Sequence, residues 1–486
     1  MRKGLFASVA ALAASAGVAC GQGSPAGGPG PVPGPTTAYP GFGTAAMSSP
    51  APVPIAPVGL KGGVPQGTPL PTAGPAEMPH NGPVPQPGIY DPWAHGKDYN
   101  PEAPAGPPGS GQLHRAAGGP DRFYVDVEWL VWRPKSGPIA FPLLTAGPPV
   151  LDAVGNVSGG VLGADGTRVL VGNDHVKYGD ALNALRVTVG WWCTCEREWG
   201  VEWSGFIQES RSEIANFFAP LEAREVLARP AIDALTGSPI ALVVSVPTGF
   251  PLERAGEAHF KSSMNFGGTE FNLLRNCLYC DMAKFNLLAG IRYIDHTEKL
   301  SIITRSQFPT SVDGSTPPDL LDISDEFDVR NQFIGGQIGF QSEFRLGRCF
   351  TDFTAKFALG NMNEQLSISG FTNSSVAGVN TSTVGGWLAL PTNIGKSNLD
   401  NFAFVPELTW KLGYQWTQRI STYIGYNWLY MSRVLRPGDQ IDATINPTLV
   451  PVSGAAGPFG PPRPARVFNE TDFWTQGVTL GLSIRY

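Results

Sequence analysis

The sequence predicts an all-β protein: a transmembrane, antiparallel, up-and-down β-barrel of about ten strands, preceded by a disordered N-terminal segment. Three observations predict this fold. Apolar and polar residues alternate from about residue 121 to the end of the chain, which is the side-chain period of a strand. The last strand ends on an aromatic residue, Tyr486. Short and long connections alternate between the predicted strands, which is the layout of outer-membrane barrels.

The C-terminal strand carries the clearest alternation. One face is wholly apolar and comprises Val478, Leu480, Leu482, Ile484 and Tyr486. The other face comprises Thr479, Gly481, Ser483 and Arg485. A terminal strand of this kind is similar to the assembly signal of bacterial outer-membrane barrels. We therefore expect outer-membrane lipid and the barrel assembly machinery to be partners of this chain.

Composition narrows the class of protein. The 486 residues carry a net charge of −6, and the chain has no strongly basic stretch, so nucleic acid is not an expected partner. Charged residues make up only 15% of the chain and there are 12 tryptophans, which suits a surface that faces lipid. No segment after the N-terminal leader has 18 consecutive uncharged apolar residues, so we expect no transmembrane helix.

The N-terminus has the pattern of a secretory signal peptide over residues 1–20. Arg2 and Lys3 precede the short apolar stretch 5–13, and small residues at 14–16 offer a cleavage site, so we expect cleavage near 16–20. Cys20 follows Gly17, Val18 and Ala19, which resembles a lipoprotein signal, although Gly17 stands where a large apolar residue is usual. Ordinary cleavage is the simpler interpretation, and lipidation of Cys20 is the alternative.

Residues 21–120 form a linker of different composition. This stretch holds 24 of the 46 prolines and has no apolar periodicity, so it cannot bury enough surface to offset its chain entropy. We expect a disordered segment with polyproline II character in the periplasm. It is either a tether that reaches the cell wall or a spacer without a partner.

The period-two pattern predicts ten strands within a barrel domain of residues 121–486. The predicted strands lie at 123–131, 185–191, 199–207, 261–276, 285–293, 334–344, 353–359, 402–414, 420–430 and 478–486. Periplasmic turns are predicted around Cys193, Cys277, Gly347 and Thr417, and long extracellular loops at 134–183, 211–260, 298–328, 370–399 and 435–472. The count becomes twelve if a loop contains a further hairpin. A soluble β-sandwich also alternates, but long strands with tryptophans near their ends favour the membrane barrel.

The barrel segment resembles the outer-membrane beta-barrel porin family seven, which occurs mainly in planctomycete bacteria. The matching stretches are 125–133, 142–148 (PLLTAGP), 286–295 (NLLAGIRYID), 388–395 (LALPTNIG), 436–442 (RPGDQID) and 471–486. They cover the whole barrel and leave out the linker. The resemblance implies an outer-membrane location and a barrel, and it implies little chemistry.

The polar faces of the strands should line the lumen. The acidic residues there are Asp126, Glu128, Glu202, Glu343, Asp352 and Glu407, and the basic residues are Arg186, Lys284, Arg292, Arg345, Lys356, Lys411 and Arg485. Such a set forms either a mixed-charge constriction in a channel or internal ion pairs that fill a narrow lumen. Since a ten-stranded barrel is close in size to barrels filled by side chains, we favour the filled lumen.

Five cysteines fall in the predicted periplasmic turns: Cys193, Cys195, Cys277, Cys280 and Cys349. Neighbouring hairpins lie side by side in a barrel and the periplasm is oxidising, so disulfides are the first expectation, with one thiol left over. A zinc site, which needs four convergent ligands, and unpaired thiols are the alternatives. We expect no metal and no cofactor.

Three functions remain for such a barrel. The first is a porin or small-solute channel in the outer membrane. The second is a structural envelope protein with a filled barrel, displayed loops and a periplasmic tether. The third, an outer-membrane hydrolase, would need His259 and His296 near the outer rim to act together, and no nucleophile motif supports it, so we expect no enzyme.

Overall fold

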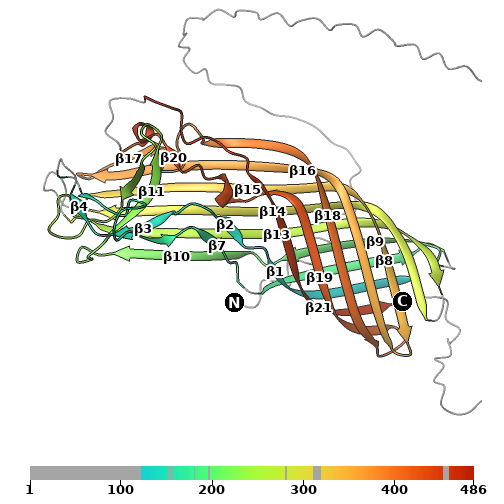
Figure 1. The fold of residues 1–486 in the computed structure, drawn as a ribbon. Coiled ribbons are helices and arrows are strands. Elements are labelled where there is room, and N and C mark those ends of the chain that lie inside the picture. Colours follow the sequence, from blue (N-terminus) through green and yellow to red (C-terminus); the bar gives the residue numbers. More distant parts are fainter. Residues whose placement is uncertain are drawn as a thin grey trace, which may run out of the picture. The chain divides into compact units, whose positions relative to one another are not determined.

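A closed ring of ten antiparallel strands forms the barrel. The computed structural model describes residues 122–151, 155, 157–179, 181–194, 197–279, 282–309, 319–452 and 459–486. The ring order is β1, β8, β9, β13, β14, β15, β16, β18, β19 and β21, and β21 pairs with β1 (Figure 1). The predicted ten-stranded up-and-down barrel is therefore confirmed. The predicted signal peptide (1–20), Cys20 and the linker (21–120) lie outside the described residues.

Every predicted strand has its counterpart in the ring. The bounds are β1 Phe123–Pro134, β8 Leu182–Trp192, β9 Trp199–Gln208, β13 Ala255–Tyr279, β14 Ala283–Gln307, β15 Leu320–Leu346, β16 Cys349–Val376, β18 Gly395–Gln415, β19 Ile420–Leu435 and β21 Glu470–Arg485. We call the end where β1 begins and β21 ends the turn end, because short turns join the strands there. The opposite end is the loop end.

An apolar band surrounds the outside of the barrel near the turn end. Its large side chains are about 38–67% exposed; they include Trp129, Trp203, Phe271, Ile291, Ile334, Ile338, Phe357, Phe402, Leu408, Trp410, Ile424, Val478, Leu480 and Leu482. Soluble monomers rarely expose a continuous apolar patch above a few hundred Å². The band is therefore the surface that faces lipid, and β21 contributes its apolar face to it.

A row of polar side chains marks where the band ends toward the loop end. On the outer face Arg330 is paired with Asp295 across β14 and β15. On the next pair of strands, β16 and β18, Asn361 and Asn363 each donate to Asp400 at 2.9 Å. These groups are exposed to solvent, which is not the environment of a side chain in the hydrocarbon core. Beyond this row the barrel stands outside the lipid.

Four strands run far beyond the polar row and form a wall. β13, β14, β15 and β16 are 25, 25, 27 and 28 residues long, whereas about 9–11 residues cross a bilayer. The expectation of long loops at 211–260, 298–328 and 370–399 was therefore wrong in part, because each of these stretches contains wall strands. β10 (Arg211–Ala219) and β17 (Val379–Val384) extend the wall on its two sides.

The connections fold into a small mixed sheet, which we call the cap. Its strands are β3 Leu144–Gly147, β6 Arg168–Val171, β11 Val226–Asp233, β12 Pro239–Val243 and β20 Thr444–Ile445. Two further pairs accompany it, β2 (Gly137–Ile139) with β7 (Asp174–Val176) and β4 (Val150–Leu151) with β5 (Val157–Ser158). The 3₁₀ helices η1 (Pro437–Gln440) and η2 (Pro447–Leu449) lie in the last connection.

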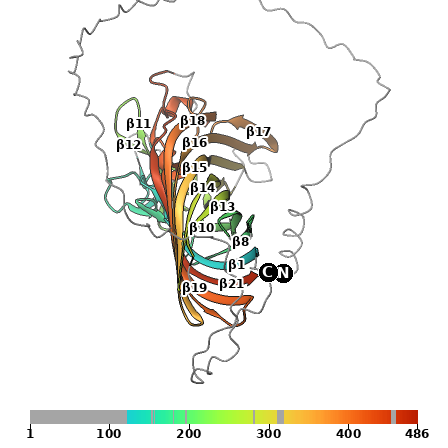
Figure 2. The ribbon, with the colours of Figure 1, turned by 90° about the vertical axis from the view of Figure 1, so that its right-hand side faces the viewer.

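The cap packs on the inner face of the wall through an apolar core. This core includes Leu144, Ala231 and Leu390 from the connections and Phe260, Leu300, Ile302, Phe327 and Ile368 from the wall. Figure 2 shows β11 and β12 beside the wall strands. Each large side chain buried here stabilises the cap–wall contact by about 1.5–3 kcal/mol. Within the described residues, no helix is long and apolar enough to cross a membrane.

Candidate functional site: the barrel interior

A chain of ion pairs crosses the lumen near the turn end. Glu407 on β18 accepts from Arg186 on β8 at 2.7 Å and from Arg292 on β14 at 2.5 Å. Arg292 also binds Glu270 on β13, which in turn pairs with Lys356 on β16. These strands lie on different sides of the ring. The ion pairs therefore span the lumen and do not simply coat one wall.

The chain of ion pairs continues from Arg186 to β1. Arg186 lies 3.7 Å from Glu128, and Glu128 pairs with Lys411 at 2.5 Å. Glu128 is 1% exposed and Glu407 is 3% exposed. Buried charges of this kind need partners of opposite sign, and here each carboxylate has at least two cationic or hydrogen-bonding neighbours. A small cavity beside the chain of ion pairs measures about 10 Å³, which is about the volume that one water molecule needs.

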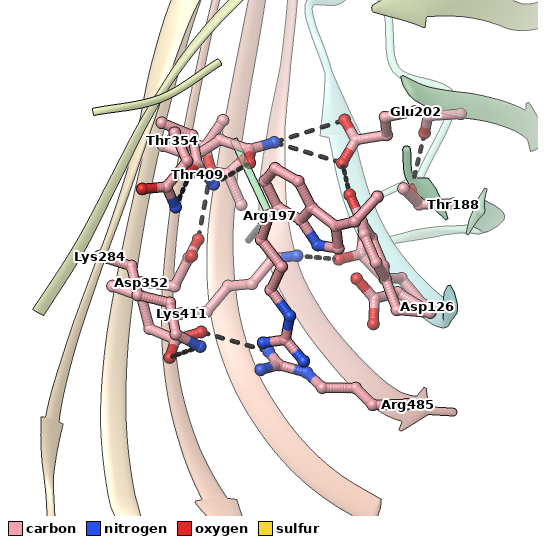
Figure 3. Close-up of a pocket in the computed structure, with 18 of the residues that line it drawn as sticks. Asp126, Thr188, Arg197, Glu202, Lys284, Asp352, Thr354, Thr409, Lys411 and Arg485 are labelled. Atoms are coloured by element: carbon pink, nitrogen blue, oxygen red, sulfur yellow. Dashed lines mark hydrogen bonds and ion pairs between the residues drawn. The ribbon is translucent and has the colours of Figure 1, made fainter. Parts of the chain in front are cut away.

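A polar cavity of about 150 Å³ lies between this chain and the turn end. Glu343 forms its best-connected group, since Lys284 and Arg485 contact it at 3.1 and 3.2 Å and Arg345 also pairs with it. Figure 3 shows Lys284 and Arg485 pointing toward one another at the cavity, with Arg197 in front of them. The cavity is therefore lined by both signs of charge.

Three further acidic residues line the cavity. Glu202 accepts from the Tyr124 hydroxyl at 2.6 Å and from Gln341 at 3.3 Å. Asp352 accepts from Thr354 at 3.2 Å. Asp126 lines the same cavity (Figure 3). The charged residues predicted from the alternation thus all lie in the ion-pair chain or around this cavity.

An apolar layer fills the lumen on the loop side of the ion pairs. Trp132 from β1, Phe266 from β13 and Phe473 from β21 are each 0–2% exposed. Their rings meet those of their neighbours at centroid distances of 5.1–6.0 Å. Further members are Leu130, Leu182, Ala184, Met264, Ile294, Phe333, Ala358, Met362, Ala403, Val405, Leu429, Met431 and Val434. Side chains from all sides of the ring therefore close the lumen with an apolar plug.

A second buried ion pair joins the apolar layer to the cap. Arg436, which directly precedes η1, binds Glu298 on β14 through two hydrogen bonds of 2.5 and 2.8 Å. Both side chains are fully buried. Beside them Asn331 on β15 binds the backbone N–H and C=O of Leu435. The last long connection is thus fixed to the inside of the wall.

A third buried ion pair lies within the cap core itself. Arg229 on β11 contacts Asp325 on β15 at 2.5 Å, and both side chains are 0% exposed. Asp325 also accepts the backbone N–H groups of Trp387, Leu388 and Ala389 at 2.7–3.0 Å. One carboxylate therefore holds a cap strand and a connecting loop against the wall.

The two candidate catalytic histidines are far apart in the sheet. His259 pairs with Ile303 in the register of β13 and β14, whereas His296 pairs with Phe266. His259 is exposed on the outer face, where Asn216 and Glu257 contact its ring. His296 is 0% exposed and packs on Phe473 with a ring separation of 4.3 Å. The structure does not bring them together.

The described cysteines lie at the turn end, as predicted. Cys193 follows β8, Cys277 lies near the end of β13 and Cys349 begins β16, and all three are exposed and have free thiols. Cys195 and Cys280 lie outside the described residues, so the predicted disulfides remain a prediction. Among the residues that the structure does describe, no group of three or more His, Cys, Asp or Glu side chains could hold a metal ion.

Sequence reasoning missed several buried charges. Glu270 lies in a stretch whose alternation is irregular, and Glu298, Asp325 and Arg229 lie in segments that were predicted to be loops. In the sequence, Arg436 stands out only as the first residue of the RPGDQID stretch. A signal was available for Glu298 and Asp325, because each alternates in phase with buried apolar neighbours on its own strand.

Comparisons with known proteins give one family. A family model described as "Putative beta barrel porin-7" matches residues 124–486, which is the whole barrel with its cap. No curated protein matches the sequence.

The chain also has weak likenesses to solved structures. The outer membrane protease OmpT from Escherichia coli shows 10% identity, covering 76% of this chain and 97% of that one, with a TM-score of 0.33. The CymD monoaromatic hydrocarbon channel shows 8% identity over 76% and 89%, with a TM-score of 0.16. A Pseudomonas aeruginosa FadL homologue shows 7% identity over 75% and 90%, with a TM-score of 0.17. At these scores the likenesses support no argument about activity.

Proposed function

Because the chain belongs to the beta barrel porin-7 family and is an outer-membrane β-barrel, we propose that it is a sealed structural protein of the envelope. In this proposal the barrel anchors the wall and cap in the outer membrane and does not conduct solutes. The loop end faces outward and displays the cap. The linker of residues 21–120 lies in the periplasm and tethers the barrel to the cell wall.

The observation that carries the proposal is the series of closures inside one barrel. A solute that enters from the turn end meets the ion-pair chain from Lys411 to Lys356, then the plug around Trp132 and Phe473, and then the cap core. A ten-stranded ring is close in size to barrels whose lumen only side chains occupy. An apolar constriction also excludes hydrated ions, because they would lose their water there.

A small-solute channel is the second candidate, and the cavity of about 150 Å³ at the turn end favours it. That cavity is polar and lined by both signs of charge, as the constriction of a channel is. Conduction would require the apolar plug and the cap to move aside together. The two candidates therefore differ in a property that can be measured directly.

Planar-bilayer recording of the refolded protein tests the proposal. Folding and insertion are checked by heat-modifiable gel migration and by protection from protease in liposomes. We expect no defined conductance steps from the wild type. Stable steps from folded, inserted wild type would overturn the sealed barrel and support the channel.

A plug variant shows that the assay can detect an opened barrel of this size. Replacing Trp132, Phe266 and Phe473 together by Ala removes the largest rings of the plug, so we expect flickering currents. The matched control is Trp129→Ala, which removes an outward-facing ring of the band and should stay silent. If the plug variant proves unstable, the wild-type recording still decides between the two candidates.

A further inference from the structure

Two strands of the wall have an open edge. β10 pairs with β13 along all nine of its residues, and β17 pairs with β16 along all six. In the described part of the chain neither strand has a ladder partner on its other side. Each therefore presents a row of backbone N–H and C=O groups that a further strand could pair with.

Apart from Arg211 and Glu213 at the start of β10, the two edges lack the features that usually protect an exposed strand. Charged side chains, proline or a bulge normally block edge-to-edge pairing. Residues 214–219 of β10 read IANFFA and residues 379–384 of β17 read VNTSTV, without charge, proline or glycine. Both uncharged runs span the same length, so they could pair from end to end.

Apolar side chains on the outer face of the wall gather at these edges. Ile214 and Phe218 on β10 are 60% and 65% exposed, and Val384 on β17 is 54% exposed beside Phe371 on β16 at 45%. Between the edges, exposed ion pairs cover the same face, namely Lys299–Glu326, Arg305–Asp322 and Arg330–Asp295. The apolar residues therefore lie where a joining strand would cover them.

Strand direction decides which edges can meet. β10 runs toward the loop end and β17 runs toward the turn end, as their registers with β13 and β16 show. Two copies inserted in one membrane have the same orientation, so a rotation about the membrane normal relates them. Two β10 edges would then meet parallel, whereas β10 of one copy meets β17 of the next in the antiparallel sense, which gives the more stable ladder.

We propose that copies of this chain associate side by side in the membrane by pairing β10 of one copy with β17 of its neighbour. The joined walls form one continuous antiparallel sheet outside the lipid, and Ile214 and Phe218 pack beside Val384 and Phe371. This contact is heterologous, since two different edges meet, so it builds either a closed ring or an open row. It requires only that the barrels share a membrane, and it is independent of whether the lumen conducts.

Cysteine cross-linking between two singly substituted copies tests the pairing. The native cysteines are first replaced by Ser; those the structure describes lie at the opposite, turn end. Asn216→Cys places a thiol on β10, and Ser382→Cys places one on β17, both on the outer face. We expect a cross-linked dimer when the two variants are mixed in liposomes with a short bismaleimide, and none from either variant alone.

Two results would overturn the proposal. One is the lack of any mixed dimer although both variants fold, as judged by heat-modifiable migration. The other is an efficient dimer from Asn216→Cys alone, which would mean that β10 edges meet each other. Cross-linking in cells to a different protein, without the mixed dimer, would also overturn it and would assign the edges to a foreign strand.

Charge substitution at the edge provides an independent measurement. Ile214→Lys with Phe218→Lys places two cations at the proposed contact, and both side chains are largely exposed in the single copy, so folding should survive. We expect light scattering in detergent to show a monomer where the wild type is larger. The matched control is Ile303→Lys. Ile303 is 40% exposed on the outer face of β14, away from both edges of the wall, so this variant should keep the wild-type mass. A monomeric wild type, or equal masses for both variants, contradicts the proposal.

Discussion

Glu364 on β16 is a buried carboxylic acid just beyond the outer polar row, outside the lipid. It is 0% exposed, and its Oε2 accepts from Asn401 at 3.3 Å. Burial, and then the nearby charge of Glu470, raise the pKa of Glu364 to about 7. The side chain is thus uncharged in the folded protein over a range of pH in which an exposed glutamate is ionised.

This shift predicts a pH-dependent stability. The folded state binds the Glu364 proton more tightly than the unfolded state, so stability falls as the pH rises from about 4.5 to about 7. Glu364→Gln keeps the acceptor for Asn401 and removes the charge. We expect a higher Tm than wild type at pH 8 and an equal Tm at pH 4, measured by circular dichroism in detergent. An equal difference at both pH values would show that the pKa is not the cause, and Glu326→Gln, on the exposed face, is the control.

At the scale of elements, Asp325 holds three parts of the loop end together. Asp325→Ala leaves Arg229 and the N–H groups of residues 387–389 without their buried acceptor. Losing one partner of a buried ion pair costs about 3–5 kcal/mol. Arg229→Met also removes one partner of the pair, but Asp325 keeps its three backbone hydrogen bonds, so we expect a loss at the lower end of this range, about 3 kcal/mol.

Urea unfolding and amide hydrogen exchange at residues 387–389 measure these losses. Exchange there should be faster in Asp325→Ala than in Arg229→Met. Arg305→Met breaks an exposed ion pair on the same wall and should change stability by less than about 1 kcal/mol. Equal effects of the two buried substitutions would mean that the backbone hydrogen bonds contribute little.

The sequence predicted the ring strands because their alternation is regular inside the band, and it missed the wall because the alternation changes phase. On β14 the inward positions carry Arg292 within the barrel, and then Leu300 and Ile302 beyond it. Outward positions change from Ile291 to Lys299 and Arg305. Within the lipid the apolar residues of a strand point outward, whereas beyond the lipid they point inward to the cap. One continuous strand therefore shows two alternating patterns of opposite phase in its sequence.

The lumen residues could be predicted and the cap could not, for a related reason. A residue such as Glu407 lies inward because its strand neighbours face lipid, and that relation is local in sequence. The pairing of Arg229 with Asp325 joins residues about a hundred positions apart, and Trp387 joins the same group from a third segment. Contacts between residues so far apart leave no periodic pattern in the sequence.

At the scale of the whole molecule, the ring closes between its first and last strands. Phe123 and Tyr486 exchange two backbone hydrogen bonds, of 3.2 and 2.8 Å, at the turn end, and their rings lie 6.4 Å apart. We predict that deleting Tyr486 lowers the yield of folded barrel at least several-fold, as measured by the heat-modifiable fraction after refolding and by outer-membrane recovery from cells. Thr475→Ser, a conservative change inside β21, is the control. Unchanged yields would show that neither closure nor assembly depends on the terminal residue.

The pairing of β1 with β21 also has a consequence for the time course of folding. It joins residues at opposite ends of the barrel sequence, such as Val125 with Ile484, so it is among the least local contacts in the protein. Contacts of this kind form slowly, because the ends of a very long loop must meet first. The ribosome makes β21 after the other nine ring strands, so the ring cannot close before β21 has been made. Every molecule must therefore wait with an open sheet, and the cell must protect that sheet from aggregation until its last strand arrives.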